Sequence, residues 1–266
     1  MYASTFGEHA KTNSQKHVSR ETLPMLEALE QLRDQCKDWG IDLEASQLRL
    51  YGAYADLLAA YELANVIGTK DWDRIILEHI VDSLSCLRLL EMRWADCLID
   101  VGAGGGLPGI PISIAHPDIR VTLLEATEKK ARFLEYVKAE LQLRNLTVLN
   151  DRAETAGRDS RYRETFDLAT ARALAALPVV LEYCAPLVRL EGKVLAMKGR
   201  LQEDEFSQGV AAARELGAEL SDTLPVDYCS RHVMKERRLV VFDKVCVTPS
   251  KYPRRVGLAK KRPLGG

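Results

Sequence analysis

The chain has 266 residues, with 37 Lys and Arg against 38 Asp and Glu, so its formal net charge is −1. This balance argues against a generally basic nucleic-acid coat protein, while 47% hydrophobic residues provide enough apolar material for a full core. No apolar run approaches roughly 18 residues, and the N-terminal residues are polar, so we expect neither a transmembrane helix nor a secretory signal.

The charge is unevenly distributed along the chain. Asp243 is the last acidic residue, and seven cations follow it without an anion. They are Lys244, Lys251, Arg254, Arg255, Lys260, Lys261 and Arg262. Without these seven, the chain has 30 basic and 38 acidic residues, so a body near −8 precedes a basic end of +7.

Six cysteines are scattered along the sequence without a C-x-x-C pair. They are Cys36, Cys86, Cys97, Cys184, Cys229 and Cys246. This pattern predicts reduced core thiols in a cytosolic protein, rather than a disulfide frame or a zinc site. We therefore expect no metal and a cytoplasmic location.

The N-terminal third reads as helical after a polar start. Residues 1–22 show no apolar periodicity, and we expect a mobile tail there. Apolar residues then recur at helical spacing in three stretches, at about 24–40, 47–63 and 73–90. Residues 23–92 are therefore predicted to form a helical N-terminal extension.

The hydrophobic period changes at Cys97, where short apolar runs begin to alternate with helical patterns. Strands are expected at 97–101, 120–125, 146–150, 166–170 and 193–198, and helices at 107–116, 127–142, 174–188 and 203–216. This alternation predicts an α/β fold for residues 93–248, with a mainly parallel, doubly wound sheet. Two further strands, 219–226 and 238–247, have little between them and predict an antiparallel edge.

A glycine-rich loop joins the first strand to the next helix. Residues 100–109 read DVGAGGGLPG, and such glycines let a backbone turn tightly and approach a ligand. The pattern alone serves NAD, FAD and S-adenosylmethionine folds alike, and it also occurs as a tight turn without a ligand.

Glu125 narrows the choice of ligand. It ends the second strand, where a carboxylate can accept hydrogen bonds from both ribose hydroxyls of a nucleoside. Asp100 before the loop would repel a pyrophosphate but suits a cationic sulfonium, which favours S-adenosylmethionine over NAD. The polar turn 150–154 follows the third strand, where an adenine edge can be read.

Several motifs in order resemble the RsmG (GidB) family of bacterial 16S rRNA guanine-N7 methyltransferases. They are DVGAGGGLPG at 100–109, DRAET at 151–155, TARA at 170–173, YPRR at 252–255 with KRP at 261–263, and EHIVDS at 78–83. The resemblance covers residue 41 to the C-terminus and leaves residues 1–40 without a counterpart. It implies a class I, Rossmann-like methyltransferase with S-adenosylmethionine as donor. The implied acceptor is one guanine of 16S rRNA, guanine 527 in the 530 loop.

The resemblance also implies cofactor contacts at several positions. These are Gly102, Leu107, Glu125, Ala126, Thr127, Ala153, Glu154 and Arg172, to which the glycine loop adds Asp100, Gly104 and Gly106. The sequence departs from the family at Asn65-Val66-Ile67, where Asn-Leu-Thr is frequent, and at Glu125, where Asp is usual. Neither departure removes a required donor or acceptor.

Methylation at N7 does not require acid–base catalysis by the protein. Guanine N7 carries a lone pair and no proton, so its attack on a sulfonium methyl needs no general base. Rate enhancement can come from alignment, for which Arg172 and Lys198 are positioning candidates. Arg172 can orient the cofactor, clamp a phosphate, or pair with a carboxylate such as Glu154. His79 lies mid-helix among apolar residues, and we expect a structural role for it.

Cations near the pocket are required to hold RNA phosphates. The predicted RNA-binding residues are Lys198, Arg200, Arg231, Lys235, Arg237, Arg238, Arg254, Arg255, Lys260, Lys261 and Arg262. Prolines at positions 249, 253 and 263 predict that the basic tail, residues 249–266, is extended rather than helical.

The expected partner is 16S rRNA or the 30S particle, without a membrane, and the expected state is a monomer. Two alternatives stay open. One is an NAD(P)-dependent oxidoreductase that uses the same glycine loop. The other is a non-catalytic ribosome-assembly factor that keeps a methyltransferase fold.

Overall fold

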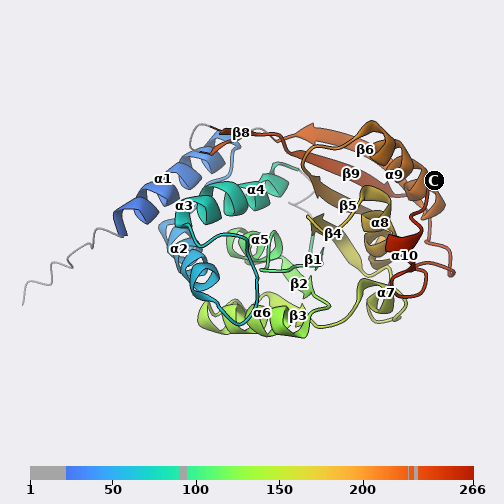
Figure 1. Ribbon diagram of the computed structural model, residues 1–266, viewed down its shortest axis with the longest axis horizontal. Coiled ribbons are helices and arrows are strands. Elements are labelled where there is room, and N and C mark those ends of the chain that lie inside the picture. The colour runs from blue at the N-terminus through green and yellow to red at the C-terminus, as the bar shows by residue number, and fades with distance from the viewer. Residues whose placement is uncertain (1–21, 90–94, 227, 231–232) are drawn as a thin grey trace, which may run out of the picture.

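The computed structural model describes residues 22–89, 95–226, 228–230 and 233–266 (Figure 1). Its centre is a seven-stranded sheet in the order β3-β2-β1-β4-β5-β9-β6. Its strands are β1 (Cys97–Val101), β2 (Arg120–Leu124), β3 (Leu146–Leu149), β4 (Phe166–Arg172), β5 (Val188–Lys198), β6 (Ala218–Pro225) and β9 (Arg238–Lys244). A separate hairpin pairs β7 (Tyr228–Ser230) with β8 (Val233–Lys235). The predicted mobile tail lies, apart from Thr22, outside the described residues.

The pairing confirms the predicted α/β fold with a mainly parallel sheet. Strands β1 to β5 pair in parallel, and β9 runs antiparallel to both β5 and β6. The antiparallel pair is thus where the sequence predicted it, but β9 lies inside the sheet and β6 forms the edge. Burial explains this order, because β9 is mostly buried whereas most β6 residues are exposed or partly exposed.

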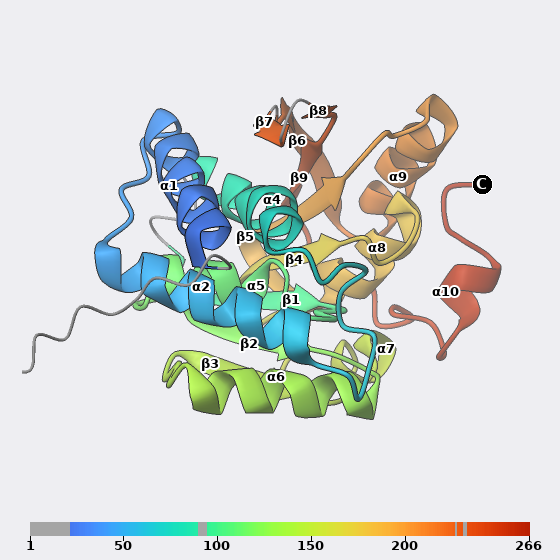
Figure 2. The same cartoon turned by 60° about the vertical axis from the view of Figure 1, so that its left-hand side comes forward.

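Helices cover both faces of the sheet (Figure 2). They are α1 (Thr22–Asp38), α2 (Ala45–Ala60), α3 (Trp72–Arg74), the π-helix η1 (Ile75–Ile80), α4 (Val81–Leu84), the 3-10 helix η2 (Ser85–Arg88), α5 (Gly109–Ala115), α6 (Glu128–Glu140), α7 (Ala153–Ala156), α8 (Leu177–Cys184), the 3-10 helix η4 (Ala185–Leu187), α9 (Glu203–Glu215) and α10 (Leu258–Lys261). The helices from α1 to α6 contribute to one hydrophobic cluster, and those from α7 to α10 to a second. None of the described helices is long and apolar enough to cross a membrane.

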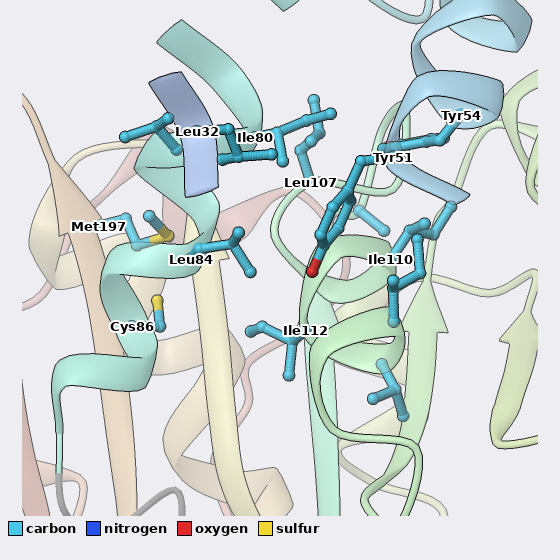
Figure 3. Close-up of a cluster of buried hydrophobic side chains, with 14 of the residues drawn as sticks. Leu32, Tyr51, Tyr54, Ile80, Leu84, Cys86, Leu107, Ile110, Ile112 and Met197 are labelled. Atoms are coloured by element: carbon cyan, nitrogen blue, oxygen red, sulfur yellow. The ribbon is translucent and has the colours of Figure 1, made fainter. Parts of the chain in front are cut away.

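The N-terminal helices share one core with α5 and α6 (Figure 3). Two tyrosines of α2 tie them to the glycine loop and to α5. The hydroxyl of Tyr54 donates to the carbonyl of Gly105 at 2.6 Å, and that of Tyr51 to the carbonyl of Pro111 at 3.1 Å. Both tyrosines are fully buried, so the N-terminal helices fix the position of the glycine loop.

The prediction of an extended basic tail is wrong at residues 258–261, which form α10. The segment also packs against the body, because Tyr252, Ala259 and Leu264 are buried in the second cluster. The prolines stop longer helices but leave room for one short helix. The apolar residues between the cations give the segment a buried side.

The predicted core thiols are found at Cys36, Cys86 and Cys184, which are buried. The prediction of a core position is wrong for Cys246, which is exposed, and Cys97 is partly exposed. All five are free thiols, and the side chain of Cys229 lies outside what the structure describes. Desolvation raises the pKa of Cys36 to about 12, as expected for an inert core thiol.

Candidate active site

The glycine loop turns sharply between β1 and α5. Gly104 has a φ of +59°, and a Cβ added there would meet only the carbonyl of Gly102, at 3.8 Å. The Gly104 backbone therefore faces open space in a conformation that favours glycine. Because the loop follows the carboxyl end of β1, it lies where doubly wound sheets bind ligands.

A cavity of about 390 Å³ lies at this edge of the sheet, and we call it the donor cavity. Seven of the predicted cofactor residues line it: Gly102, Gly104, Glu125, Ala126, Thr127, Ala153 and Glu154. They follow β1 and β2 or begin α7. The structure therefore brings together segments that the sequence only placed in chain order.

Glu125 lines the donor cavity, and two backbone N–H groups orient its carboxylate. One of its carboxylate oxygens accepts from the Gly104 N–H at 2.9 Å, and the other accepts from the Thr127 N–H at 2.7 Å. The residue is 7% exposed, and the Asn150 side chain donates to its backbone carbonyl at 2.7 Å. A carboxylate oxygen has two lone pairs, so each oxygen keeps one for a ligand hydroxyl.

Three loop residues that were predicted as cofactor contacts do not line the donor cavity. Asp100, Gly106 and Leu107 are buried, and Asp100 accepts from the Gly109 N–H at 2.9 Å. Burial raises the pKa of Asp100 to about 7. Asp100 thus ties the loop to the start of α5, which corrects the expectation that it faces a sulfonium.

Arg172 also lies outside the donor cavity. Of its three expected roles, the structure shows the ion pair with a carboxylate, but the partner is Asp82 rather than the example given, Glu154. Its Nη1 donates to Asp82 Oδ2 and to the His79 carbonyl, both at 3.2 Å. Glu154 instead accepts from the Gly257 N–H at 2.8 Å. The sequence could not show this, because Asp82 and Arg172 are 90 residues apart.

Arg172 lines a second cavity of about 260 Å³. It shares this cavity with His79, Asp82, Lys198 and Arg237. Lys198 donates to the Ala175 carbonyl at 3.0 Å and pairs with Glu205 at 2.6 Å. Burial lowers the pKa of His79 to about 4, with the positive charge of Arg172 the next cause, so the ring is neutral near pH 7.

The cations at the basic end have three different placements. Lys244 is buried and pairs with Glu164, and Arg254 pairs with the buried Glu182. Lys260 lines the donor cavity with Gly257. Lys260 is also exposed, as are the remaining cations of the basic end, Lys251, Arg255, Lys261 and Arg262, and the predicted RNA-binding residues Arg200 and Arg238 before it. Arg231 and the side chain of Lys235 lie outside what the structure describes.

Some lining residues of the donor cavity were not predicted as cofactor contacts one by one. They are Lys130, Arg152, Ala173, Leu174, Tyr183, Gly257 and Lys260. Arg152 lies in the polar turn expected at the adenine and Ala173 in the TARA motif, whereas Lys260 had been predicted to bind RNA. Ala173 and Leu174 directly follow β4, so their position at a strand end was the available signal. Tyr183 and Gly257 reach the cavity only through tertiary packing. In the described part of the chain, no group of three or more His, Cys, Asp or Glu side chains is placed to hold a metal ion.

Comparison with known proteins gives one consistent family. Residues 47–234 match the family model described as GidB, rRNA small subunit methyltransferase G. A Rubrobacter xylanophilus protein named ribosomal RNA small subunit methyltransferase G is 47% identical over 251 residues, which cover 94% of each chain. A protein of the same name from a Roseiflexus species is 39% identical, over 89% of this chain and all of its own.

Among solved structures, the mitomycin 7-O-methyltransferase MmcR has a similar fold. Its TM-score is 0.51 at 13% identity, over 76% of this chain and 71% of that one. The likeness in fold agrees with the Rossmann-like architecture expected from the sequence. The family match covers most of the described sheet and its helices, and the chain belongs to the rRNA small subunit methyltransferase G (GidB) family.

Proposed function

We propose that this chain transfers a methyl group from S-adenosylmethionine to N7 of a single guanine in the 530 loop of 16S rRNA. We propose that it acts as a monomer in the cytoplasm, on the rRNA or on the small-subunit particle. One observation carries the proposal: in a chain of this family, a glycine-lined cavity holds the fixed carboxylate of Glu125 at the carboxyl edge of the sheet.

The donor cavity fits a nucleoside with vicinal hydroxyls. Glu125 presents two oriented carboxylate oxygens, and the Gly104 backbone leaves open space beside them. Thr127, Ala153 and Glu154 line the same cavity, where the adenine would lie. When bound there, S-adenosylmethionine supplies an electrophilic methyl group on a sulfonium.

The second cavity supports the proposed acceptor chemistry. The N7 lone pair forms the new N–C bond while the C–S bond breaks, and its electron pair stays on sulfur. No proton leaves N7, so no general base is required. The neutral ring of His79 does not conflict with this reaction. Arg172 and Lys198 have the role of positioning the base, since both line this cavity.

The exposed cations are proposed to bind RNA phosphates. Arg200, Arg255, Lys261 and Arg262 are exposed and available for this purpose. Lys260, at the donor cavity, is proposed to contact the cofactor side of the complex. Arg254 is assigned to anchoring the tail, because its Nε and Nη2 atoms already pair with the two carboxylate oxygens of Glu182.

Purified protein, labelled S-adenosylmethionine and small-subunit particles that lack the modification test the proposal. Chromatography of the digested rRNA should show label in 7-methylguanosine. Glu125→Gln should weaken cofactor binding by about 10- to 100-fold, because a hydrogen-bonded charged acceptor is lost. Glu128→Gln is the matched control, since Glu128 is exposed and does not line the cavity. Label on another atom, or none, would contradict the proposal.

The family match argues against the oxidoreductase alternative. The labelling experiment described above also distinguishes the proposed methyltransferase from the second alternative, a ribosome-assembly factor without activity. A non-catalytic assembly factor would bind rRNA without transferring label or binding S-adenosylmethionine.

A further inference from the structure

The second cavity lies beside the donor cavity at the same edge of the sheet. Arg172 ends β4 and Lys198 ends β5, and both line it. Ala173 lines both cavities, so the two adjoin at this residue. A group bound in the second cavity can therefore present an atom to the donor cavity.

The N-terminal helices complete this cavity. His79 belongs to η1 and Asp82 to α4, which lies close to β4 and β5 (Figure 2). A π-helix is rare and is frequently found at functional sites. The helical extension therefore supplies one wall of the second cavity, in addition to its role in the core.

Two arginines are held together in this cavity by one carboxylate. Asp82 lies 3.2 Å from Arg172 Nη1 and 3.7 Å from Arg237 Nε, through its two different oxygens. The Asp82 side chain is only 5% exposed, and that of Arg172 is 14% exposed. A guanidinium has five N–H donors, so these contacts leave further donors on both arginines.

We propose that the second cavity receives the target guanine and that Arg172 and Arg237 select it through its O6 atom. This inference rests on the proposed function. Guanine presents two acceptors on one edge, N7 and O6, and arginine commonly binds both. During methyl transfer N7 must face the donor cavity, which leaves O6 as the acceptor for the arginines.

The same donors reject adenine. Adenine carries an amino group in place of O6, so the arginine N–H groups would face N–H groups instead of an acceptor. A site built to donate to an oxygen discriminates strongly against an analogue that lacks it, because its buried polar groups lose their partner. The arginines therefore select guanine at O6, which lies on the same edge of the base as the reacting atom N7.

Asp82 has a positioning role in this scheme. Methylation at N7 places a positive charge on the base, close to two guanidinium groups. The Asp82 carboxylate offsets that charge and holds both arginines in place. Its contribution acts through the arginines rather than through contact with the base.

Base analogues at the target position test O6 recognition directly. Small-subunit particles are reconstituted with guanosine, inosine or 2-aminopurine riboside at that position. Inosine keeps O6 and N7 but lacks the amino group at C2, whereas 2-aminopurine keeps N7 and that amino group but lacks O6. We expect inosine to be methylated within about threefold of guanosine, and 2-aminopurine at least roughly tenfold more slowly. Equal rates for 2-aminopurine and guanosine would overturn the inference.

Enzyme variants separate base recognition from other roles. Arg237→Gln should slow methylation of the guanosine particle by about tenfold or more, yet change the rate for 2-aminopurine little, because the lost contact is to O6. Asp82→Asn should reduce the same selectivity. Arg144→Lys is the control, since Arg144 is exposed and precedes β3 at the opposite end of the sheet. Equal losses on both particles would indicate a phosphate contact and overturn the inference.

The two proposals fail in different ways. If the wild-type protein binds S-adenosylmethionine but methylates no particle at N7, the proposed function fails and this inference with it. If it methylates guanosine and 2-aminopurine equally, only the selection by Arg172 and Arg237 fails.

Discussion

Replacing Arg254 with alanine removes the side chain that anchors the C-terminal segment to α8. The Arg254 guanidinium binds both carboxylate oxygens of Glu182, at 2.5 Å from Nη2 to Oε2 and 2.9 Å from Nε to Oε1. The Glu182 side chain is completely buried, and that of Arg254 is 20% exposed. Among the described residues, the only other partner of this carboxylate is the Arg254 backbone N–H, at 2.9 Å.

The expected loss of stability follows from this geometry. Removing one partner of a buried ion pair costs about 3–5 kcal/mol, because the other charge stays buried without it. Since one fifth of Arg254 is exposed, we expect a loss near the lower end, about 3 kcal/mol. This corresponds to a fall in melting temperature of about 6–12 °C for a protein of this size. Cofactor affinity should fall as well, because Gly257 and Lys260 line the donor cavity.

Thermal unfolding and calorimetric titration with S-adenosylmethionine measure both effects. Arg255→Ala is the matched control, since Arg255 is an exposed neighbour, and it should change neither quantity. Adding Glu182→Leu to Arg254→Ala removes the buried charge and should restore much of the stability, while the affinity stays low. Equal melting temperatures for the Arg254 and Arg255 variants would refute the anchoring role.

Three further predictions concern the loop, its acid and the tail. At Gly106, φ is +94° and an added Cβ would lie 2.3 Å from a neighbouring side-chain carbon. Gly106→Ala should therefore cost about 1–3 kcal/mol in urea unfolding, and Gly68→Ala, with nothing within 4 Å, should cost under about 0.5 kcal/mol. Burial raises the pKa of Asp100 to about 7, so its contribution to stability is complete below about pH 4 and is lost as the pH rises to about 7. Asp100→Asn should flatten this pH dependence of unfolding, and an unchanged slope would contradict the assignment. Arg255→Ala and Lys261→Ala should each lower the salt slope of rRNA binding by about 0.7–0.9, and a loss of cofactor affinity instead would show a role in the donor cavity.

Most of the correct predictions came from patterns among residues that are neighbours in the sequence. The glycine loop and Glu125 were recognisable because each follows an apolar strand directly, and both line the donor cavity. Strand β9 was recognisable from its valines. Its place inside the sheet was not, because strand order depends on which faces are buried.

Contacts between distant segments account for the rest. An ion pair of Arg172 with a carboxylate was one of its expected roles, but the sequence did not indicate that the partner is Asp82 on the N-terminal helices. The basic end contains no anion of its own, so its anchoring carboxylates, Glu182 and Glu154, could not be foreseen. The sequence therefore indicated an unpaired RNA-binding tail where the structure has a packed segment at the donor cavity.

Mapping of 7-methylguanosine in cellular rRNA tests the central proposal most directly. Small-subunit rRNA from cells with and without the gene is reduced, cleaved with aniline and read by primer extension. We expect a cleavage signal at one guanine of the 530 loop that disappears without the gene and returns when the gene is restored. The same signal in both strains would contradict the proposed function.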